Sequence, residues 1–393
     1  MRSAIVLSGL ATGLATIRGL AEGSIPTFLV TFKDKDLAEF SRFSKVVRFK
    51  NDLTNEVNFI EELITFSTSF DEKPVIYPSS DSQALLLAKY ENRLRDHLLF
   101  SSNSCKKLES IIHKDNLYLL AQNKVPLIPS INSPTLAKLE QWSNKFTGPY
   151  FLKPFYEGIA GATFLEKNIQ LENQTELLDF AKEKGLSSIV IQQLLTGGDD
   201  FIFDCYGYCD RDGNIVVQAT HRRIRQLSPD YGTTCFGEIP ANLAHNGDQT
   251  IMKLSKTLLS GMNYHGIFAI EWLQDKKTGD FFLIDFNARS FSSISHLTDC
   301  GLNLPLLAFQ ELSGNDYEPL LQRSKLKHKY WMNFTRDFGS FLLKNKAGKL
   351  GLLTWFCSIL KCRCFAIWKL SDPLPALYQF TLLAKLIWKR IWS

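Results

Sequence analysis

The sequence has 393 residues, 45% of them hydrophobic and 22% charged, which is the balance of a globular protein of two or three domains and excludes a disordered chain. Its formal charge of +5 is unevenly placed, because residues 344–393 hold nine Lys or Arg and a single acid, Asp372. Eight cysteines without the CxxC spacing of a zinc site exclude a disulfide framework and predict reduced thiols in a reducing cytoplasm.

The start of the chain combines Arg2 with an apolar stretch over residues 4–17. Gly9, Gly13 and Thr16 interrupt that stretch, as a turn between a strand and a helix does. We therefore expect folded structure here rather than a signal peptide. No apolar run reaches the roughly 20 residues of a spanning helix, so the sequence does not predict a transmembrane protein.

The first 107 residues alternate between strand and helix patterns. Strands are predicted at 4–8, 27–32, 45–49 and 74–77, and helices at 14–21, 56–66 and from Asp81, which we expect to cap its helix. Alternation of this kind predicts a parallel sheet flanked by helices, a Rossmann-like α/β domain. Its glycine turn, residues 8–13, reads GxxxG rather than GxGxxG, so a plain tight turn is favoured over a dinucleotide site.

Residues 108–325 change to an α+β pattern. Apolar alternation at 201–209 and 215–224, joined by an Asp-Gly turn at 212–213, predicts an antiparallel hairpin. Earlier, a strand at 150–154 contains Lys153 and is followed by a small-residue loop with Gly158 and Gly161. A lysine beside such a loop can pair with phosphate oxygens while backbone amides close over them. The alternative is a lysine that is simply solvated at a strand end.

A second candidate element runs from residue 189 to residue 201. A strand that passes into a linker exposes backbone groups to a flat base edge, and an acid shortly afterwards can accept hydrogen bonds from ribose hydroxyls. The alternative is a loop whose paired aspartates, Asp199 and Asp200, are only solvated.

The strongest candidate consists of two apolar strands, residues 268–272 and 282–289. A turn between them would place Glu271 alongside Asp285, and the two-residue period puts Asp285, Asn287 and Arg289 on one face. Hard oxygen ligands suit Mg²⁺, and a neighbouring arginine suits phosphate. A surface charge ladder fits poorly, because the intervening residues are large and apolar.

Residues 326–393 form a basic, aromatic-rich segment that we predict to be helical. Two interpretations remain open at this point. The helices either contact an anionic membrane surface peripherally, or bury their aromatic face on the rest of the protein. Nucleic acid is the less favoured partner, since no binding motif accompanies the charge.

Taken together, these elements resemble the ATP-grasp superfamily, and within it the carboxylate-amine ligases grouped with D-aspartate ligase and, distantly, carbamoyl-phosphate synthase. The resemblance spreads over the first 310 residues and rests on the order and spacing of several stretches. They are 14–20, 114–118 before 125–126, 152–154, 192–197, 222–226 before Pro229 and Gly232, and 285–289.

The resemblance implies a role for each matching residue. Lys114 and Lys153, with the loop of Gly158 and Gly161, would contact ATP phosphates; the backbone of Gln193 and Leu195 would read adenine, and Asp200 the ribose. Glu271, Asp285 and Asn287 would hold Mg²⁺, and Arg223 and Arg289 would stabilise the transferred phosphoryl group. Gln193 and Asp285 stand where the family often has glutamate, and Ala288 where proline is frequent.

The expected activity is an ATP-dependent ligase that joins a small-molecule carboxylate to an amine through an acyl phosphate, with D-aspartate and a cell-envelope precursor as the favoured substrates. Such chemistry needs positioning and charge neutralisation rather than a nucleophile, so structural roles are expected for His221 and Ser293. The alternatives are a carboxylase that activates bicarbonate and an ATP-binding regulatory protein without turnover.

Overall fold

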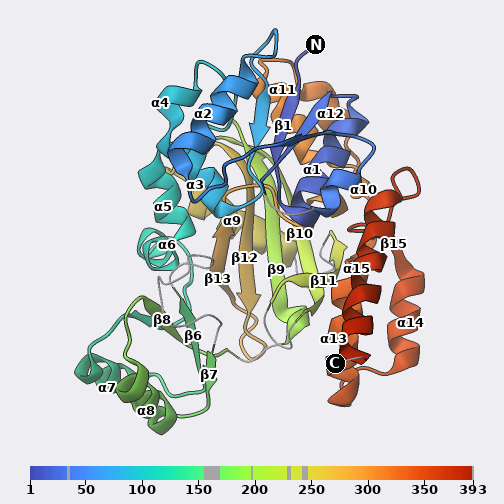
Figure 1. Cartoon of the computed structure of the whole chain (residues 1–393). Helices are drawn as coiled ribbons and strands as arrows, with labels where there is room; N and C mark the ends of the chain where they lie inside the picture. The colour runs from blue at the N-terminus through green and yellow to red at the C-terminus, as the bar shows by residue number, and fades with distance from the viewer. Residues whose placement is uncertain (33–35, 155–168, 196–197, 228–231, 241–246, 392–393) are drawn as a thin grey trace.

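A computed structural model gives the fold and describes residues 1–32, 36–154, 169–195, 198–227, 232–240 and 247–391. Three sheets organise the described chain (Figure 1). The predicted residues Gly158 and Gly161 lie outside the described residues.

The N-terminal sheet is parallel, with the strand order β3-β2-β1-β4. Its strands are β1 (Ala4–Leu7), β2 (Thr27–Thr31), β3 (Lys45–Arg48) and β4 (Val75–Tyr77). The helices between and after them are α1 (Leu10–Glu22), the short 3-10 helix η1 (Leu37–Phe40), α2 (Glu56–Ser67), α3 (Asp81–Lys89) and α4 (Glu91–Leu94). The predicted α/β domain is therefore confirmed, and the strands differ from the predicted ranges by one residue at an end.

Two local details differ from the simplest sequence interpretation. Asp81 is the first residue of α3 rather than its cap, because the Ser80 side chain accepts the hydrogen bond from the backbone N–H of Gln83. The glycine turn before α1 is closed by the protein itself: Asp36 accepts hydrogen bonds from the Ser8 hydroxyl and from the backbone N–H of Leu10 at 3.0 Å. The plain-turn interpretation therefore fits this loop.

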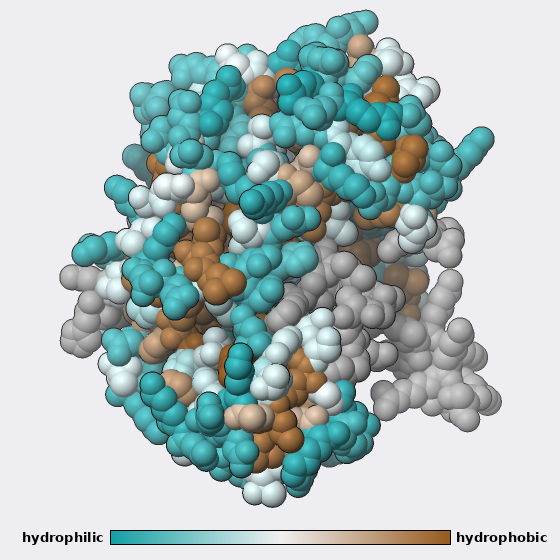
Figure 2. Space-filling view, turned by 90° about the vertical axis from the view of Figure 1, so that its left-hand side faces the viewer, coloured by the Kyte–Doolittle hydropathy of each residue, from teal (hydrophilic) through white to brown (hydrophobic). Residues whose placement is uncertain are grey.

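A small antiparallel sheet lies at the lower left of Figure 1, with the order β5-β8-β6-β7. It has its own apolar core, formed with two helices. The elements of this region, including the two helices that lead into it, are α5 (Cys105–Ile112), α6 (Lys114–Ala121), β5 (Ser130–Asn132), α7 (Leu136–Lys145), β6 (Tyr150–Pro154), β7 (Ile169–Leu171), α8 (Gln174–Lys184) and β8 (Ile189–Gln193). The face that carries this sheet is largely hydrophilic, with scattered apolar patches (Figure 2).

The central sheet has seven strands in the order β13-β12-β9-β10-β11-β14-β15. The predicted hairpin is present as β9 (Ile202–Cys209) and β10 (Ile215–Gln226), whose turn contains Gly213 at φ +81°. The other elements up to residue 332 are η2 (Asp199–Phe201), β11 (Thr234–Ile239), α9 (Gly247–Leu259), β12 (Gly266–Gln274), β13 (Phe281–Asn287), α10 (Ile294–Cys300), α11 (Leu304–Leu312), α12 (Glu318–Arg323) and β14 (Lys329–Met332).

The C-terminal segment is not purely helical, because it adds β14 and β15 (Cys362–Phe365) to the edge of the central sheet. Its helices are α13 (Phe334–Lys346), α14 (Leu352–Lys361) and α15 (Leu374–Ile391). Trp355 is buried and stacks on Phe341 at 4.5 Å between ring centroids, whereas Phe356 and Trp368 are exposed. The packing interpretation thus holds for part of the segment.

All eight cysteines are unpaired, as the sequence predicted. Burial raises the pKa of the Cys205 and Cys209 thiols to about 12, so both stay protonated in the core. Within the described residues, no helix is long and apolar enough to cross a membrane.

Candidate nucleotide and metal site

A cavity of about 630 Å³ opens between the N-terminal domain, the small sheet and the central sheet. This volume lies within the range of roughly 300–1,000 Å³ typical of small-molecule sites. The predicted residues that line it are Lys114, Lys153, Arg223, Glu271, Asp285, Asn287 and Arg289. The fold therefore gathers, in one place, residues that are up to 175 positions apart in the sequence.

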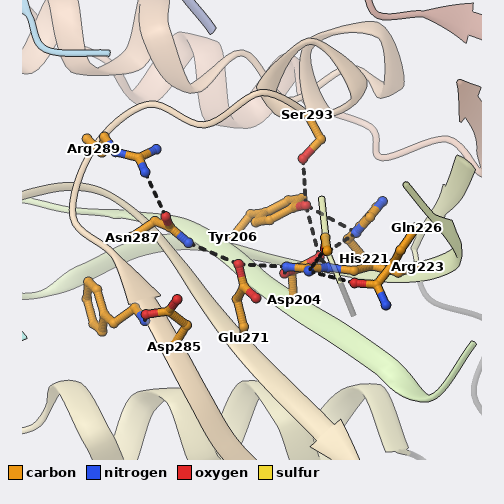
Figure 3. Close-up of polar contacts among 12 residues, drawn as sticks. Asp204, Tyr206, His221, Arg223, Gln226, Glu271, Asp285, Asn287, Arg289 and Ser293 are labelled. Carbon is orange, nitrogen blue, oxygen red and sulfur yellow. Dashed lines mark hydrogen bonds and ion pairs between the residues drawn. The ribbon is translucent and has the colours of Figure 1, made fainter. Parts of the chain in front are cut away.

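The two acidic residues lie side by side on neighbouring strands. Glu271 of β12 is the register partner of Asp285 of β13. Asn287, two residues further along β13, donates a hydrogen bond from Nδ2 to Oε1 of Glu271 at 3.1 Å. Arg289 follows and donates to Oδ1 of Asn287 at 3.0 Å (Figure 3). The two-residue period that predicted a shared face is borne out by this row.

Arg223 connects the acidic pair to a third carboxylate, that of Asp204 on β9. Its Nη2 lies 2.7 Å from Oε1 of Glu271 and 2.6 Å from Oδ1 of Asp204, while its Nε donates to Oδ2 of Asp204 at 3.1 Å. Burial raises the pKa of Asp204, but the charge of Arg223 and hydrogen bonds from His221 and Arg223 outweigh burial and leave that pKa well below its ordinary value. The Asp204 carboxylate and the Arg223 guanidinium are therefore both charged at neutral pH.

Asp204 also organises a set of buried polar side chains, of which Asp204, Tyr206 and Ser293 line the cavity. Its Oδ2 accepts hydrogen bonds from the hydroxyl of Tyr206 at 3.1 Å and lies 2.7 Å from Nδ1 of His221. Tyr206 in turn is 2.8 Å from the hydroxyl of Ser293 (Figure 3). His221 is fully buried, and its ring is packed so closely that a Cβ on Gly237 would lie 2.4 Å from Nε2. His221 is buried outside the cavity lining, in keeping with a structural role, whereas Ser293 lines the cavity.

Two further ion pairs hold cations beside this row of polar residues. Lys114, the first residue of α6, lies 3.6 Å from Oδ2 of Asp285. Arg289 makes a bidentate ion pair with Asp81 of α3, with Nε–Oδ1 at 2.9 Å and Nη2–Oδ2 at 3.0 Å. Asp81 was not identified from the sequence as a site residue. It ties the N-terminal domain to the row of polar residues on β13.

The residues predicted to read the nucleotide are Gln193, Leu195 and Asp200, and they are placed less directly. Leu195 packs in an apolar cluster with Ile202 and Ile284, which both line the cavity, so the end of the β8 region reaches its edge. Gln193 and Asp200 are not among the described lining residues. The Gln193 side chain donates to the carbonyl of Thr147, and Asp200, half exposed, lies 3.5 Å from Arg222.

Apolar surface at this end of the cavity comes from Phe151, Ile202 and Ile284. The ammonium group of Lys153 lies 5.3 Å from the ring centroid of Phe151. A flat apolar wall beside a lysine is a suitable surface for a purine base and its phosphates.

The chemistry of the acidic pair fits Mg²⁺. Within the described part of the chain, no group of three or more His, Cys, Asp or Glu side chains could hold a metal. Mg²⁺ does not need one, because it commonly takes one or two carboxylates and completes its shell with water and substrate phosphates. Burial raises the pKa of Glu271; Arg223 opposes this shift, and Asp204 and Asp285 add to it. A cation beside Glu271 and Asp285 would relieve the repulsion between these carboxylates.

Comparison with known proteins defines the fold. No protein-family model matches the sequence, and no curated protein matches it. An L-amino acid ligase from Bacillus licheniformis superposes with a TM-score of 0.65 at 15% identity, covering 84% of this chain and 79% of the ligase. An N5-carboxyaminoimidazole synthetase from Staphylococcus aureus also gives a TM-score of 0.65, at 11% identity. The match covers 88% of this chain and 86% of the synthetase.

A third similar structure is a biotin carboxylase from Campylobacter jejuni in a β-γ-ATP complex, with a TM-score of 0.64 at 16% identity. It covers 84% of this chain and 75% of the carboxylase. The chain therefore has the fold of the ATP-grasp ligases and carboxylases.

Proposed function

We propose that this protein is an ATP-dependent carboxylate-amine ligase that uses ATP and Mg²⁺. The observation that carries the proposal is the register pairing of Glu271 with Asp285, continued by Asn287 and Arg289, on one wall of a cavity that Lys114 and Lys153 also line. On an ATP-grasp fold, this set of oxygen ligands and cations suits a magnesium-bound triphosphate.

The proposed reaction has two steps. A carboxylate oxygen attacks the γ-phosphorus, the bond from that phosphorus to the bridging oxygen breaks, and ADP leaves. The amine nitrogen then attacks the acyl carbon, phosphate departs with the bonding electrons, and the nitrogen loses a proton to solvent or to phosphate. The metal, when bound, would neutralise phosphate charge at Glu271, Asp285 and Asn287.

The protein's own groups would act by position and charge. Arg289 is held by Asp81 and Asn287 at the edge of the acidic pair, and Lys114 is held by Asp285. Such preset cations need no reorganisation when negative charge moves from one oxygen to another. Arg223 is less accessible to phosphate, because Asp204 and Glu271 already hold it. It would stabilise the transferred phosphoryl group only after Glu271 turned toward a metal.

We propose the backbone of Gln193 and Leu195 as the adenine-reading segment and Asp200 as the ribose acceptor. The apolar wall of Ile202 and Ile284 beside Leu195 supports that location for the base. Asp200 would exchange its contact with Arg222 for the ribose hydroxyls. For the acceptors we propose D-aspartate or a related amino acid and a cell-envelope precursor, following the sequence resemblance to the D-aspartate ligase group.

The experiment that tests the activity is a screen of amino acids and sugar acids for stimulated release of phosphate from ATP by the full chain. The proposal predicts release that requires both an acid and an amine, with amide formed in equal amount. ADP release driven by bicarbonate without an amine would identify a carboxylase instead, an alternative favoured by the biotin carboxylase likeness. ATP binding without turnover under any acceptor would identify a regulatory protein.

We also propose that the C-terminal segment docks the protein on an anionic membrane surface in the cytoplasm. Large apolar side chains are exposed along α14, with Leu353 81% and Leu360 62% accessible. The same segment also carries exposed cations: Lys346, Lys349, Lys361 and Arg363. Both acids of the segment are buried, Asp372 against Arg18 and Asp337 against Arg225, so neither adds exposed negative charge. Apolar and cationic side chains presented together suit anionic lipid headgroups.

Sedimentation with vesicles tests this docking. The full chain should bind phosphatidylglycerol-containing vesicles and not phosphatidylcholine vesicles, and Leu353→Asp should weaken binding at least tenfold. Val57→Asp, which changes another exposed apolar residue, 52% accessible and on α2, is the control and should bind as the wild type does. Equal binding of both variants, or no binding to anionic vesicles, would remove the proposal.

A further inference from the structure

Arg336 brings a positive charge from the C-terminal segment into the cavity. It lies in the first turn of α13 and lines the cavity together with Gln226, Gly232, Thr233 and Thr234. Its Nη1 is buried and, among the residues that the structure describes, has no hydrogen-bond partner. A buried guanidinium donor without a partner is rare and costly in native proteins, so it needs an explanation.

The surrounding contacts hold Arg336 in place without neutralising it. The adjacent acid, Asp337, is fully buried and committed to Arg225, with Oδ1–Nε at 2.8 Å and Oδ2–Nη2 at 3.0 Å. The indole of Trp355 also donates to Asp337 at 2.8 Å. These bonds fix α13 against β10 and α14. Burial lowers the pKa of Arg336, which is the shift expected of a cation that lacks a carboxylate partner.

The other arginines that line the cavity are matched by acids. Arg223 pairs with Asp204 and Glu271, and Arg289 pairs with Asp81. Arg336 differs from both, because no such pair involves it in the described structure. An anionic group entering this end of the cavity would therefore gain a charge-assisted hydrogen bond without having to displace a protein carboxylate.

Arg336 lines a side of the cavity that lies several strands from Asp285. In the central sheet, β13 with Asp285 and β11 with Thr234 are separated by β12, β9 and β10. Four strand spacings of about 4.8 Å place them about 19 Å apart along the sheet. Arg336 thus lines the β10–β11 side of the cavity, away from Asp285, and Arg223 links that side to Glu271 through its contacts with Gln226 and Gly232.

We propose that Arg336 binds a carboxylate of the acceptor substrate that is not the one activated by ATP, so that the enzyme selects an acceptor with an additional acidic group. Gln226 and the hydroxyls of Thr233 and Thr234 line the same end and offer further hydrogen bonds to that group. The identification of the ligand as an acceptor substrate rests on the proposed ligase function. Binding of an anion at Arg336 does not depend on turnover.

The test measures binding and turnover separately, on the full chain. Calorimetry with succinate, D-aspartate and L-aspartate, with D-alanine as the singly carboxylated comparison, is done in the presence of Mg²⁺ and a non-hydrolysable ATP analogue. The wild type should bind at least one dicarboxylate more tightly than D-alanine. Arg336→Gln should weaken that binding by roughly 10- to 100-fold, Arg336→Lys should retain part of it, and neither should change binding of the ATP analogue.

Two controls separate this site from a loss of folding and from failure of the ligase proposal. Arg363→Gln removes an exposed cation of the same segment and should leave dicarboxylate binding unchanged. Arg336→Met should unfold at the same temperature as the wild type or higher, because it removes a buried charge that has no acid partner. Unchanged dicarboxylate affinity in Arg336→Gln, or a wild type that binds none of the dicarboxylates, would overturn the anion site. Normal dicarboxylate binding without any amide formation would overturn the ligase instead.

Discussion

Replacing Asp204 by Asn should destabilise the protein substantially. The side chain is buried, with 1% of its surface accessible, and holds Arg223 through two bonds while also accepting from Tyr206 and contacting His221. Removing one member of a buried ion pair costs about 3–5 kcal/mol, because the other charge loses its compensation. Arg223 would keep Glu271 at 2.7 Å, so we expect a loss of about 3 kcal/mol, near the lower end of that range.

Urea unfolding followed by tryptophan fluorescence measures this loss. Asp212→Asn, in the exposed turn between β9 and β10, is the matched control and should leave the unfolding free energy nearly unchanged. A decrease of less than about 1 kcal/mol for Asp204→Asn would refute the reasoning, since it would mean that Arg223 is adequately compensated without Asp204.

Two other predictions follow from buried contacts. Glu311 accepts hydrogen bonds from Tyr208 and Arg211 and pairs with His265; although burial opposes them, they lower its pKa from 4.5 to about 2. Because the folded-state pKa is depressed, this stabilisation of about 3 kcal/mol is present above about pH 4.5 and is lost as the pH falls toward 2. The difference in unfolding free energy between wild type and Glu311→Gln should shrink over that range, and a constant difference would contradict it. Gly237→Ala should destabilise by about 1–3 kcal/mol, because its Cβ would lie 2.7 Å from a backbone carbonyl, whereas Gly339→Ala in α13 should be neutral or stabilising.

Local patterns in the sequence predicted the parts of the site that lie within one hairpin or one strand. Alternation along residues 268–289 placed Glu271, Asp285, Asn287 and Arg289 on one face, because the strand period and the short turn determine that geometry. The same alternation along β9 contained a signal for Asp204 and Tyr206, which are two residues apart and share a face. That signal was missed, because the strand looked like an ordinary apolar core strand.

The site residues that the sequence did not predict come from distant segments of the chain. Asp81 meets Arg289 across 208 positions, and the sequence suggested only a capping role for it. Arg336 enters the cavity from a segment that appeared to be a separate basic tail. Its position depends on the Arg225–Asp337 pair and on the two strands that join this segment to the central sheet. Such packing contacts have no periodic signature in the sequence.

The most direct test of the central claim is acid- and amine-dependent phosphate release by Asp285→Ala, compared with wild type and with Asp280→Ala, which alters an exposed acid just before the same strand. If Asp285 holds the magnesium that the triphosphate needs, Asp285→Ala should lose at least about 100-fold in rate, equivalent to about 2.7 kcal/mol of transition-state stabilisation. Asp280→Ala should retain wild-type turnover. Normal phosphate release by Asp285→Ala would contradict the assignment of this cavity as the site of phosphoryl transfer.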